Sequence, residues 1–284
     1  MNHIVIGIPT YKRPSMLKKL VNSIYECDLN RRYIGKVDII VIDNDLEQTA
    51  LPQVFELKEK CPSDFTFHYH SYYEKGLSGV RNKLLEKSYE LNPGFIAFVD
   101  DDEYVAPEWL NELLIVQLNT NADLVLGPNR PVFEEDIPTN LARWYKIEKY
   151  ENEIQLDFVE TNNLLIKTSF IRANNLSFDP RFDTTGGEDT FFGVQSLKVG
   201  AKIYWAKNAL VYETIPKNRT KLKWLLQRKY RGATTYAYIL KLEGKYGKLI
   251  KKFLISIIYV LLGILCMPLI LFPVKWKYLG VVKF

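Results

Sequence analysis

A regular alternation of strand-like and helix-like segments along the first 130 residues constrains the fold most strongly. Short, buried-type runs rich in Ile, Val and Phe are separated by stretches with helical apolar spacing. This alternation is typical of βαβ units, so we expect an α/β fold with a mostly parallel central sheet. Strands are expected at 4–8, 37–42, 65–69, 95–99 and 122–126, and helices at 14–27, about 47–60, 77–91 and from Pro107.

The pattern is mixed beyond Pro131. We expect a strand over 158–166, a loop over 184–189, a helix over 190–199, short strands at 202–205 and 209–213, and a long basic helix over 219–242. The expected division is a catalytic domain over 1–218, a basic amphipathic helical segment over 219–252 and a hydrophobic membrane-anchoring tail over 253–284.

The charge of the chain is unevenly distributed. Residues 217–252 contain 12 Lys and Arg residues and one acid, Glu243, a net of +11. Lys275, Lys277 and Lys283 add three positive charges, so the rest of the chain carries −9 within a total of +5. A basic segment beside an apolar one favours an anionic membrane surface, and the acidic body argues against nucleic acid.

The apolar segment is 253–274, which has 22 residues without a charge. As a helix it is long enough to cross a hydrocarbon core of about 30 Å. Lysines on both sides, with Trp276 and Tyr278 after it, are typical interfacial anchors. Pro268 and Pro273 would kink it or make it re-enter the same leaflet. The alternative is a buried core helix.

The three cysteines, Cys27, Cys61 and Cys266, are unrelated in spacing. They exclude a disulfide framework and a Cys-rich zinc site, and they fit a reducing compartment. The first ten residues lack a signal-peptide pattern, so the body is expected on the cytoplasmic face of the plasma membrane. His68 and His70 alternate on an expected strand, but no third metal ligand is indicated, and we assign them structural roles.

Polar side chains follow three of the expected strands where each strand ends. They are Thr10-Tyr11, Asp43-Asn44-Asp45 and Asp100-Asp101-Asp102. Because ligands bind beyond the carboxyl ends of the strands in open α/β sheets, we expect these clusters to converge on a site. Three adjacent carboxylates also favour a bound cation such as Mg²⁺ or Mn²⁺. The alternative is an exposed acidic turn in which Asp102 caps the next helix.

Two further segments carry chemistry. Gly186 and Gly187 precede Glu188 and Asp189 at the expected start of a helix, whose positive end favours ionised carboxylates. Asp189 is a candidate general base, although ordinary helix N-capping would explain it equally. The segment 76–82 opens a helix and places Arg81 one turn in, which is typical of an anion site.

These motifs, taken in order, resemble those of family 2 glycosyltransferases over about residues 3–240. The resemblance rests on segments 8–14 (IPTYKRP), 41–44 (VIDN), Gly76 with Arg81-Asn82, 98–103 (FVDDDE) and 187–189 (GED). It implies the GT-A Rossmann-like fold and an inverting, nucleotide-sugar-dependent enzyme. The chain departs from many relatives at Asn44, where they carry Asp, so the base (uridine or thymidine) stays open.

The resemblance also implies roles for single residues. The loop after the first strand would hold the nucleotide, with Asp43 or Asn44 reading the edge of the base, Arg81 near the base and diphosphate, and Asp101 near the ribose. Asp189 would be the catalytic base, with Glu188 beside it. The implied nucleotide-binding set is Pro9, Thr10, Tyr11, Arg13, Asp43, Asn44, Arg81, Asp100 and Asp101.

The implied cofactor is Mn²⁺ or Mg²⁺, held by Asp102 as the direct ligand and by Asp100. Glu213 stands where many relatives have a metal-binding His, and an oxygen ligand suits the same ions; a solvent-facing Glu is the alternative. Asn162 resembles part of a donor-sugar pocket, or it lies in a plain turn. Arg219, Arg228 and Arg231 would clamp the diphosphate, or some of them would face lipid headgroups.

The implied reaction moves a sugar from a nucleoside-diphosphate sugar, UDP or dTDP type, to a hydroxyl of a lipid-linked glycan. Such a step belongs to cell-surface polysaccharide synthesis, of capsule or O-antigen type. Two alternatives stay open, a nucleotidyltransferase and a non-catalytic membrane-bound module that binds nucleotide sugars. The first usually has a Gly-rich loop after its first strand, and 9–14 contains no glycine. The second would lack the carboxylates.

Overall fold

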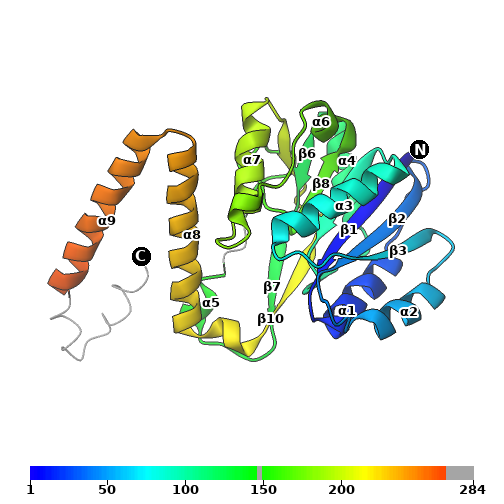
Figure 1. The fold of residues 1–284 in the computed structure, drawn as a ribbon, viewed down its shortest axis with the longest axis horizontal. Helices are drawn as coiled ribbons and strands as arrows, with labels where there is room; N and C mark the ends of the chain where they lie inside the picture. Colours follow the sequence, from blue (N-terminus) through cyan, green and yellow to red (C-terminus); the bar gives the residue numbers. More distant parts are fainter. Residues whose placement is uncertain (146–148, 267–284) are drawn as a thin grey trace. The chain divides into compact units, whose positions relative to one another are not determined.

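The computed structural model describes residues 1–145 and 149–266, and the chain divides into two compact units. Unit 1 comprises Met1–Asp136 and Tyr145–Arg219, and unit 2 comprises Ile137–Trp144 and the chain from Thr220 onward. Figure 1 shows the elements of both units in chain order. All of the strands in the described part of the chain belong to unit 1.

A seven-stranded sheet forms the centre of unit 1, in the order β3-β2-β1-β4-β8-β6-β9. The strands β1, β2, β3 and β4 run parallel, and β8 is antiparallel to both of its neighbours. The mostly parallel α/β sheet expected from the alternation is therefore confirmed. The strands are β1 (Asn2–Thr10), β2 (Ile34–Asp43), β3 (Phe65–Ser71), β4 (Phe95–Val99), β6 (Leu124–Leu126), β8 (Asn163–Lys167) and β9 (Ile203–Trp205).

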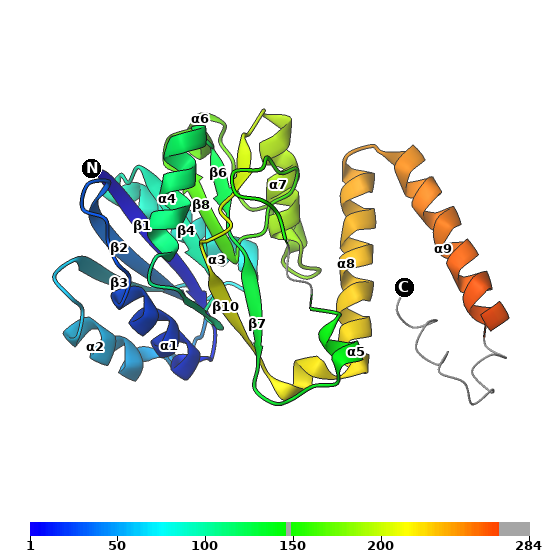
Figure 2. The ribbon, with the colours of Figure 1, turned by 180° about the vertical axis from the view of Figure 1, so that it is seen from behind.

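Helices cover both faces of this sheet because the central strands are apolar on both sides. In β1, for example, Ile4 and Ile6 pack toward one face and Val5 packs toward the other. One core lies under α1 (Pro14–Tyr25), α2 (Leu51–Glu59) and α4 (Trp109–Thr120). The second lies under α3 (Leu77–Leu91), α6 (Thr168–Ala173) and α7 (Glu188–Lys198), and Figures 1 and 2 show the two faces from opposite sides.

A small three-stranded sheet, ordered β5-β10-β7, adjoins the turn Asp100-Asp101-Asp102 after β4, which we call the acidic turn. Its strands are β5 (Glu103–Val105), β7 (Asn129–Phe133) and β10 (Val211–Ile215). The antiparallel register of β10 with β5 pairs Glu213 with Glu103. The backbone N–H of Thr214 also donates to the carbonyl of Asp102 at 2.9 Å. This sheet therefore fixes Glu213 beside the acidic turn, although the two lie more than 100 residues apart.

Unit 2 is helical in its described part, with α5 (Thr139–Ala142), α8 (Leu222–Leu242) and α9 (Tyr246–Cys266). The helix α9 is long and apolar enough to cross a membrane, and its apolar stretch is not buried in the described structure. The alternative of a buried core helix therefore does not hold for the described part of 253–274. Pro268, Pro273 and the flanking residues 275–278 lie outside the described residues.

Several boundaries differ from those expected. The strand expected over 158–166 begins only at Asn163, and Pro107 lies two residues before the start of α4. Glu188 and Asp189 lie inside α7 and not in a loop. The short elements β5, β7, α5 and α6 were missed because three to six residues give too little periodicity to identify.

Candidate active site

The sheet register brings the expected polar clusters to one edge. Thr10, the last residue of β1, pairs with Asp43 of β2, and Asp43 pairs with Ser71 of β3. On the other side, Val99 at the end of β4 pairs with Asn163 at the start of the antiparallel β8. The carboxyl ends of β1, β2 and β4 and the amino end of β8 therefore meet, as the strand pattern predicts.

Asp101 connects the acidic turn to the loop that follows β1 through hydrogen bonds. Its Oδ2 accepts a hydrogen bond from the Thr10 hydroxyl at 2.8 Å and from the Tyr11 backbone N–H at 3.3 Å, and its Oδ1 accepts one from Arg13 Nη1 at 2.8 Å. Burial raises the pKa of Asp101 to about 6. The positive charge and the hydrogen bond of Arg13 act in the opposite direction and lower this pKa. Tyr11, by contrast, is 56% exposed, so its ring is available to a ligand. Pro9 is buried.

Asp43 and Asn44 join the loops that follow β2 and β3. The buried Asp43 carboxylate accepts from the Asp45 N–H at 2.9 Å and from the Tyr69 hydroxyl at 2.8 Å, and burial raises its pKa. The Asn44 amide donates to the carbonyls of Tyr72 and Glu74. Both side chains thus shape the expected base-binding edge, and Asn44 is the more exposed of the two.

Arg81 joins the acidic turn to the start of α7. Its side chain is 3% exposed. Nη1 donates to Glu188 Oε1, and Nη2 donates to Asp100 Oδ1 at 3.3 Å. Burial raises the pKa of Asp100 and of Glu188, and the positive charge of Arg81 opposes both shifts. Two segments that are 88 residues apart in sequence therefore share one buried cation.

Asp189 lies one residue into α7, after two glycines that adopt positive φ angles, 74° at Gly186 and 93° at Gly187. Gly187 is the N-cap residue, so Asp189 is not the helix cap that the alternative required. Its Oδ1 accepts from the Thr190 N–H at 2.6 Å, and its negative charge raises the pKa of both Glu188 and Asp100. Asp189 is partly exposed, whereas Glu188 is buried.

Asp102 and Glu213 share one cationic partner. Arg219 Nη1 donates to Asp102 Oδ2 and to Glu213 Oε1, at 3.1 Å in each case. Asp102 Oδ2 also accepts from Arg13 Nη1 at 3.0 Å. Their side chains are only 10% and 18% exposed. The structure therefore does not support the two alternatives, an exposed turn in which Asp102 caps the next helix and a Glu213 that faces solvent. Glu108 is the N-cap residue of α4, and both side chains are mostly buried.

These carboxylates fit a divalent cation that a substrate helps to hold. Across residues 1–145 and 149–266, no group of three or more His, Cys, Asp or Glu side chains is placed to bind a metal alone. Mg²⁺ and Mn²⁺, however, are commonly bound by one or two carboxylates together with waters and substrate phosphates. Asp102 and Glu213 both contact a single cationic atom, Arg219 Nη1, so one oxygen of each carboxylate lies within reach of a shared cation.

Sequence reasoning missed two carboxyl groups that support the site. The buried Glu103 accepts from the Asp100 backbone N–H at 2.8 Å and from the Asn129 amide at 2.6 Å. Burial, with the nearby charge of Asp100, raises the pKa of Glu103 well above its ordinary value. Asp183 accepts from the Ser78 N–H at 2.8 Å and so occupies the start of α3, where an external anion was expected. Of the two, only Glu103 could have been noticed in the sequence, because it is the fourth consecutive acidic residue after β4.

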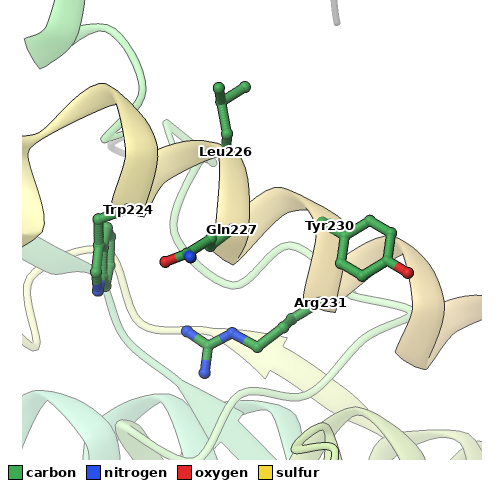
Figure 3. Close-up of a pocket in the computed structure, with 5 residues that line it drawn as sticks. All are labelled: Trp224, Leu226, Gln227, Tyr230 and Arg231. Atoms are coloured by element: carbon green, nitrogen blue, oxygen red, sulfur yellow. The ribbon is translucent and has the colours of Figure 1, made fainter.

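The remaining candidates divide between the units. Asn162 lies directly before β8, at the edge where the other loops meet, and is partly exposed. Arg228 and Arg231 belong to α8 in unit 2. Figure 3 shows Arg231 extending toward Gln227 and Trp224, with which it lines a surface pocket, and Arg228 lies over the Trp224 ring at 5.4 Å.

Comparisons with known proteins agree with this geometry. A sequence model of the family described as "Glycosyl transferase family 2" matches residues 5–179. The chain is 32% identical to the succinoglycan biosynthesis protein ExoM of Rhizobium meliloti (strain 1021) over 248 residues, 84% of this chain and 75% of that protein. It is 27% identical to the putative glycosyltransferase EpsH of Bacillus subtilis (strain 168) over 195 residues, 66% of this chain and 55% of that protein.

Solved structures of S. aureus TarS share the fold. The structure of TarS 1-349 in complex with UDP-GlcNAc has a TM-score of 0.57 and 19% sequence identity, and the match covers 76% of this chain and 59% of that chain. The complex with UDP matches with the same TM-score and 20% identity, covering 76% and 61%. At this identity the likeness establishes the fold alone.

Proposed function

The chain belongs to glycosyl transferase family 2, and from that premise we propose that it transfers a sugar from a nucleoside-diphosphate sugar, UDP or dTDP type, to a hydroxyl of a lipid-linked glycan. Transfer would proceed with inversion, by a single displacement at the anomeric carbon. The product would enter a cell-surface polysaccharide of capsule, O-antigen or exopolysaccharide type. ExoM, by its name a succinoglycan biosynthesis protein, supports this class of product.

The observation that carries the proposal is the pairing of Arg81 with both Asp100 and Glu188. This pairing holds the start of α7, with Asp189, against the acidic turn after β4. A base on one side and a phosphate-binding region on the other are what a displacement at a sugar carbon requires, since the acceptor oxygen and the leaving diphosphate lie on opposite faces of that carbon.

Asp189 is the proposed general base. Its carboxylate is partly exposed at the start of α7, where it can accept a proton from an acceptor hydroxyl. Glu188 is less suited to the role because it is buried against Arg81. In our proposal Asp189 removes the acceptor hydroxyl proton while that oxygen attacks, and Glu188 and Arg81 keep it in place.

Asp102 and Glu213, with Asp100 nearby, would hold Mn²⁺ or Mg²⁺. Such an ion, when bound, would neutralise charge that develops on the leaving nucleoside diphosphate. The chain's own residues supply the rest of the donor site. Arg13 and Arg219 already lie against Asp102 and would orient the phosphates, while Tyr11 and Asn44 would face the base.

Unit 2 supports a membrane-held acceptor. The helix α9 is exposed and apolar, and unit 2 carries ten of the twelve basic residues of 217–252. We propose that α9 anchors the protein at the cytoplasmic face of the plasma membrane, where a lipid-linked saccharide is accessible. Arg228 and Arg231 would then meet anionic headgroups or the acceptor diphosphate.

A donor panel tests the proposal. Full-length protein in detergent is given Mn²⁺ or Mg²⁺ and a series of UDP-, dTDP- and GDP-sugars, and released nucleoside diphosphate is measured. We expect slow hydrolysis of one donor, abolished by EDTA and by Asp102→Ala. Pyrophosphate release from a nucleoside triphosphate and a sugar phosphate would instead indicate a nucleotidyltransferase. Nucleotide binding without turnover, even with lipid-linked acceptors added, would indicate a binding module.

A further inference from the structure

The helix α8 exposes a row of apolar side chains along one face. Leu222, Leu226, Tyr230 and Ala233 follow one another at intervals of four, four and three residues, which places them on the same side of a helix. We call this row the apolar stripe. Leu222 is 44% exposed, Leu226 is 51% exposed and Tyr230 is 71% exposed. Away from the stripe lie three of the four buried residues of α8, Leu225, Thr235 and Ile239.

Two lysines border the apolar stripe. At 3.6 residues per turn, Lys229 lies beside Leu222 at one edge of the stripe, and Lys223 lies beside Tyr230 at the other edge. Both lysines are exposed. An exposed apolar face with lysines along its borders is typical of a helix that lies in the interface of a membrane, since a lysine stem can cover apolar surface while its amine stays in the headgroup region.

The positive charge of α8 is not neutralised within the described chain. The helix contains five basic residues and no acidic one, and no carboxylate of the described residues pairs with Lys223 or Lys229. The helix α3 of unit 1 differs, because there Lys83 pairs with Glu86 and Lys87 pairs with Glu90, each at 2.6 Å. The basic residues of α8 therefore match an external anionic surface.

The position of α8 in the chain identifies that surface. The helix ends at Leu242, and α9, the candidate membrane span, begins at Tyr246. Any bilayer that takes up α9 therefore lies within a few residues of α8. A phospholipid surface offers both an apolar interior for the stripe and anionic headgroups for the lysines.

We propose that α8 is an interfacial helix that lies on an anionic bilayer, with the apolar stripe below the headgroups and Lys223 and Lys229 among the lipid phosphates. The proposal rests on the proposed function in one respect, that α9 holds the protein at a membrane. A stripe of this length does not anchor a protein by itself. In our proposal α9 supplies the attachment, and α8 adds a preference for anionic lipid.

A surface pocket at the edge of the apolar stripe extends this contact. Leu226 and Tyr230 of the stripe line the pocket together with Gln227 and Arg231, as Figure 3 shows. Apolar and cationic side chains thus lie side by side, as a phospholipid requires where its acyl chains meet its phosphate. Tyr230 suits this depth because its ring is apolar and its hydroxyl is polar.

The first test uses wild-type, full-length protein in vesicles of phosphatidylcholine and phosphatidylglycerol. Hydroxyl-radical oxidation, mapped by mass spectrometry, compares Tyr230 with Tyr11 of unit 1, which is 56% exposed. We expect Tyr230 to be oxidised at least about fivefold more slowly than Tyr11, because the bilayer covers it. The difference should shrink in vesicles of phosphatidylcholine alone, which offer no net negative charge.

The second test titrates the protein with vesicles and measures the bound fraction by flotation. A basic residue near an anionic surface strengthens binding about fivefold, so Lys223→Gln with Lys229→Gln should reduce the preference for anionic over neutral vesicles at least about tenfold. The matched control is Lys83→Gln with Lys87→Gln, which removes the same charge from unit 1. It should change the preference by less than about threefold.

Three results would overturn the proposal: equal oxidation of Tyr230 and Tyr11 on anionic vesicles, equal protection of Tyr230 on neutral vesicles, or an unchanged lipid preference in the α8 variant. Each of them leaves α9 as the anchor and donor turnover untouched. If wild-type protein floats with neither kind of vesicle, the anchoring by α9 fails as well, and donor turnover in detergent still tests the proposed reaction separately.

Discussion

At the scale of single residues, buried charges in unit 1 are matched by specific partners. Away from the site, the fully buried Asp38 of β2 bonds His3 Nε2 at 2.6 Å, His68 Nε2 at 2.7 Å and Lys36 Nζ at 2.9 Å. Burial alone would raise the pKa of Asp38, but hydrogen bonds from His68, Lys36 and His3 outweigh it and lower the pKa. His68 thus has the structural role expected of it.

Asp38→Asn should lower the free energy of unfolding by about 2–3 kcal/mol at pH 7, because it weakens charge-assisted hydrogen bonds. A carboxyl whose pKa is lowered by folding stabilises the protein above its unfolded pKa of about 3.9, and this contribution disappears as the pH falls through the lower, folded value. The difference between variant and wild type should therefore shrink below about pH 4, as measured by urea denaturation.

The matched control is Asp64→Asn, since Asp64 is 58% exposed and pairs only with Arg31 among the described residues. It should change the free energy of unfolding by no more than about 0.5 kcal/mol. A constant deficit of Asp38→Asn between pH 7 and pH 3 would contradict the assignment of its stabilising effect to the ionised carboxylate.

At the scale of elements, the start of α3 fixes the loop that leads to Asp189. Asp183 bonds the Ser78 N–H, and the Ser78 hydroxyl donates to the Asp179 carbonyl at 2.9 Å. Gly76 makes the close approach possible, because it has a φ angle of 127° and a Cβ there would lie 2.1 Å from the Asp183 carboxyl carbon. The start of one helix thus positions the segment before the next.

Gly76→Ala should lower the free energy of unfolding by about 1–3 kcal/mol, through backbone strain and loss of the Asp183 contact. It should also reduce donor turnover, because α7 loses part of its support. The control is Gly232→Ala in α8, where a Cβ meets nothing within 4 Å and alanine should favour the helix by up to about 1 kcal/mol. Equal stability of the Gly76 variant and wild type would refute this role.

The elements also show how far sequence reasoning extends. Strands β1 to β4 and the helix over 77–91 were predictable because apolar periodicity and chain-order motifs are local signals. The sheet edge that gathers Thr10, Asp43 and Asp100 followed from topology rules. The partners of each side chain could not be predicted from the sequence. The Arg219–Asp102 contact joins residues 117 positions apart, and the Ser78–Asp183 contact joins residues 105 positions apart.

At the scale of the whole molecule, charge and hydropathy separate along the chain. The acidic residues gather in unit 1, whereas unit 2 carries most of the basic segment and the exposed apolar helix α9. Along α9, most apolar side chains from Phe253 to Leu265 are exposed, including Ile257 at 42% and Leu261 at 56%. Such a surface in water favours association with another apolar surface, either a membrane or a protein.

Replacing Ile257 and Leu261 together by arginine should release the protein from membranes, since a charge at the centre of an inserted helix costs about 2.5–3.5 kcal/mol. Flotation with vesicles that contain anionic lipid would measure the bound fraction. Leu46→Arg is the control, because Leu46 is 76% exposed in unit 1 and should not affect flotation. Unchanged flotation of the α9 variant would argue against α9 as the anchor.

In the proposed function, Asp189 acts as the general base while other residues bind the donor. The most direct measurement compares donor turnover and UDP binding in wild type and Asp189→Asn, with the same full-length protein and metal. We predict that the variant loses about 10²-fold or more in turnover, the range typical of a general base, and binds UDP as wild type does. Turnover close to wild type would contradict the assignment of Asp189 as the base.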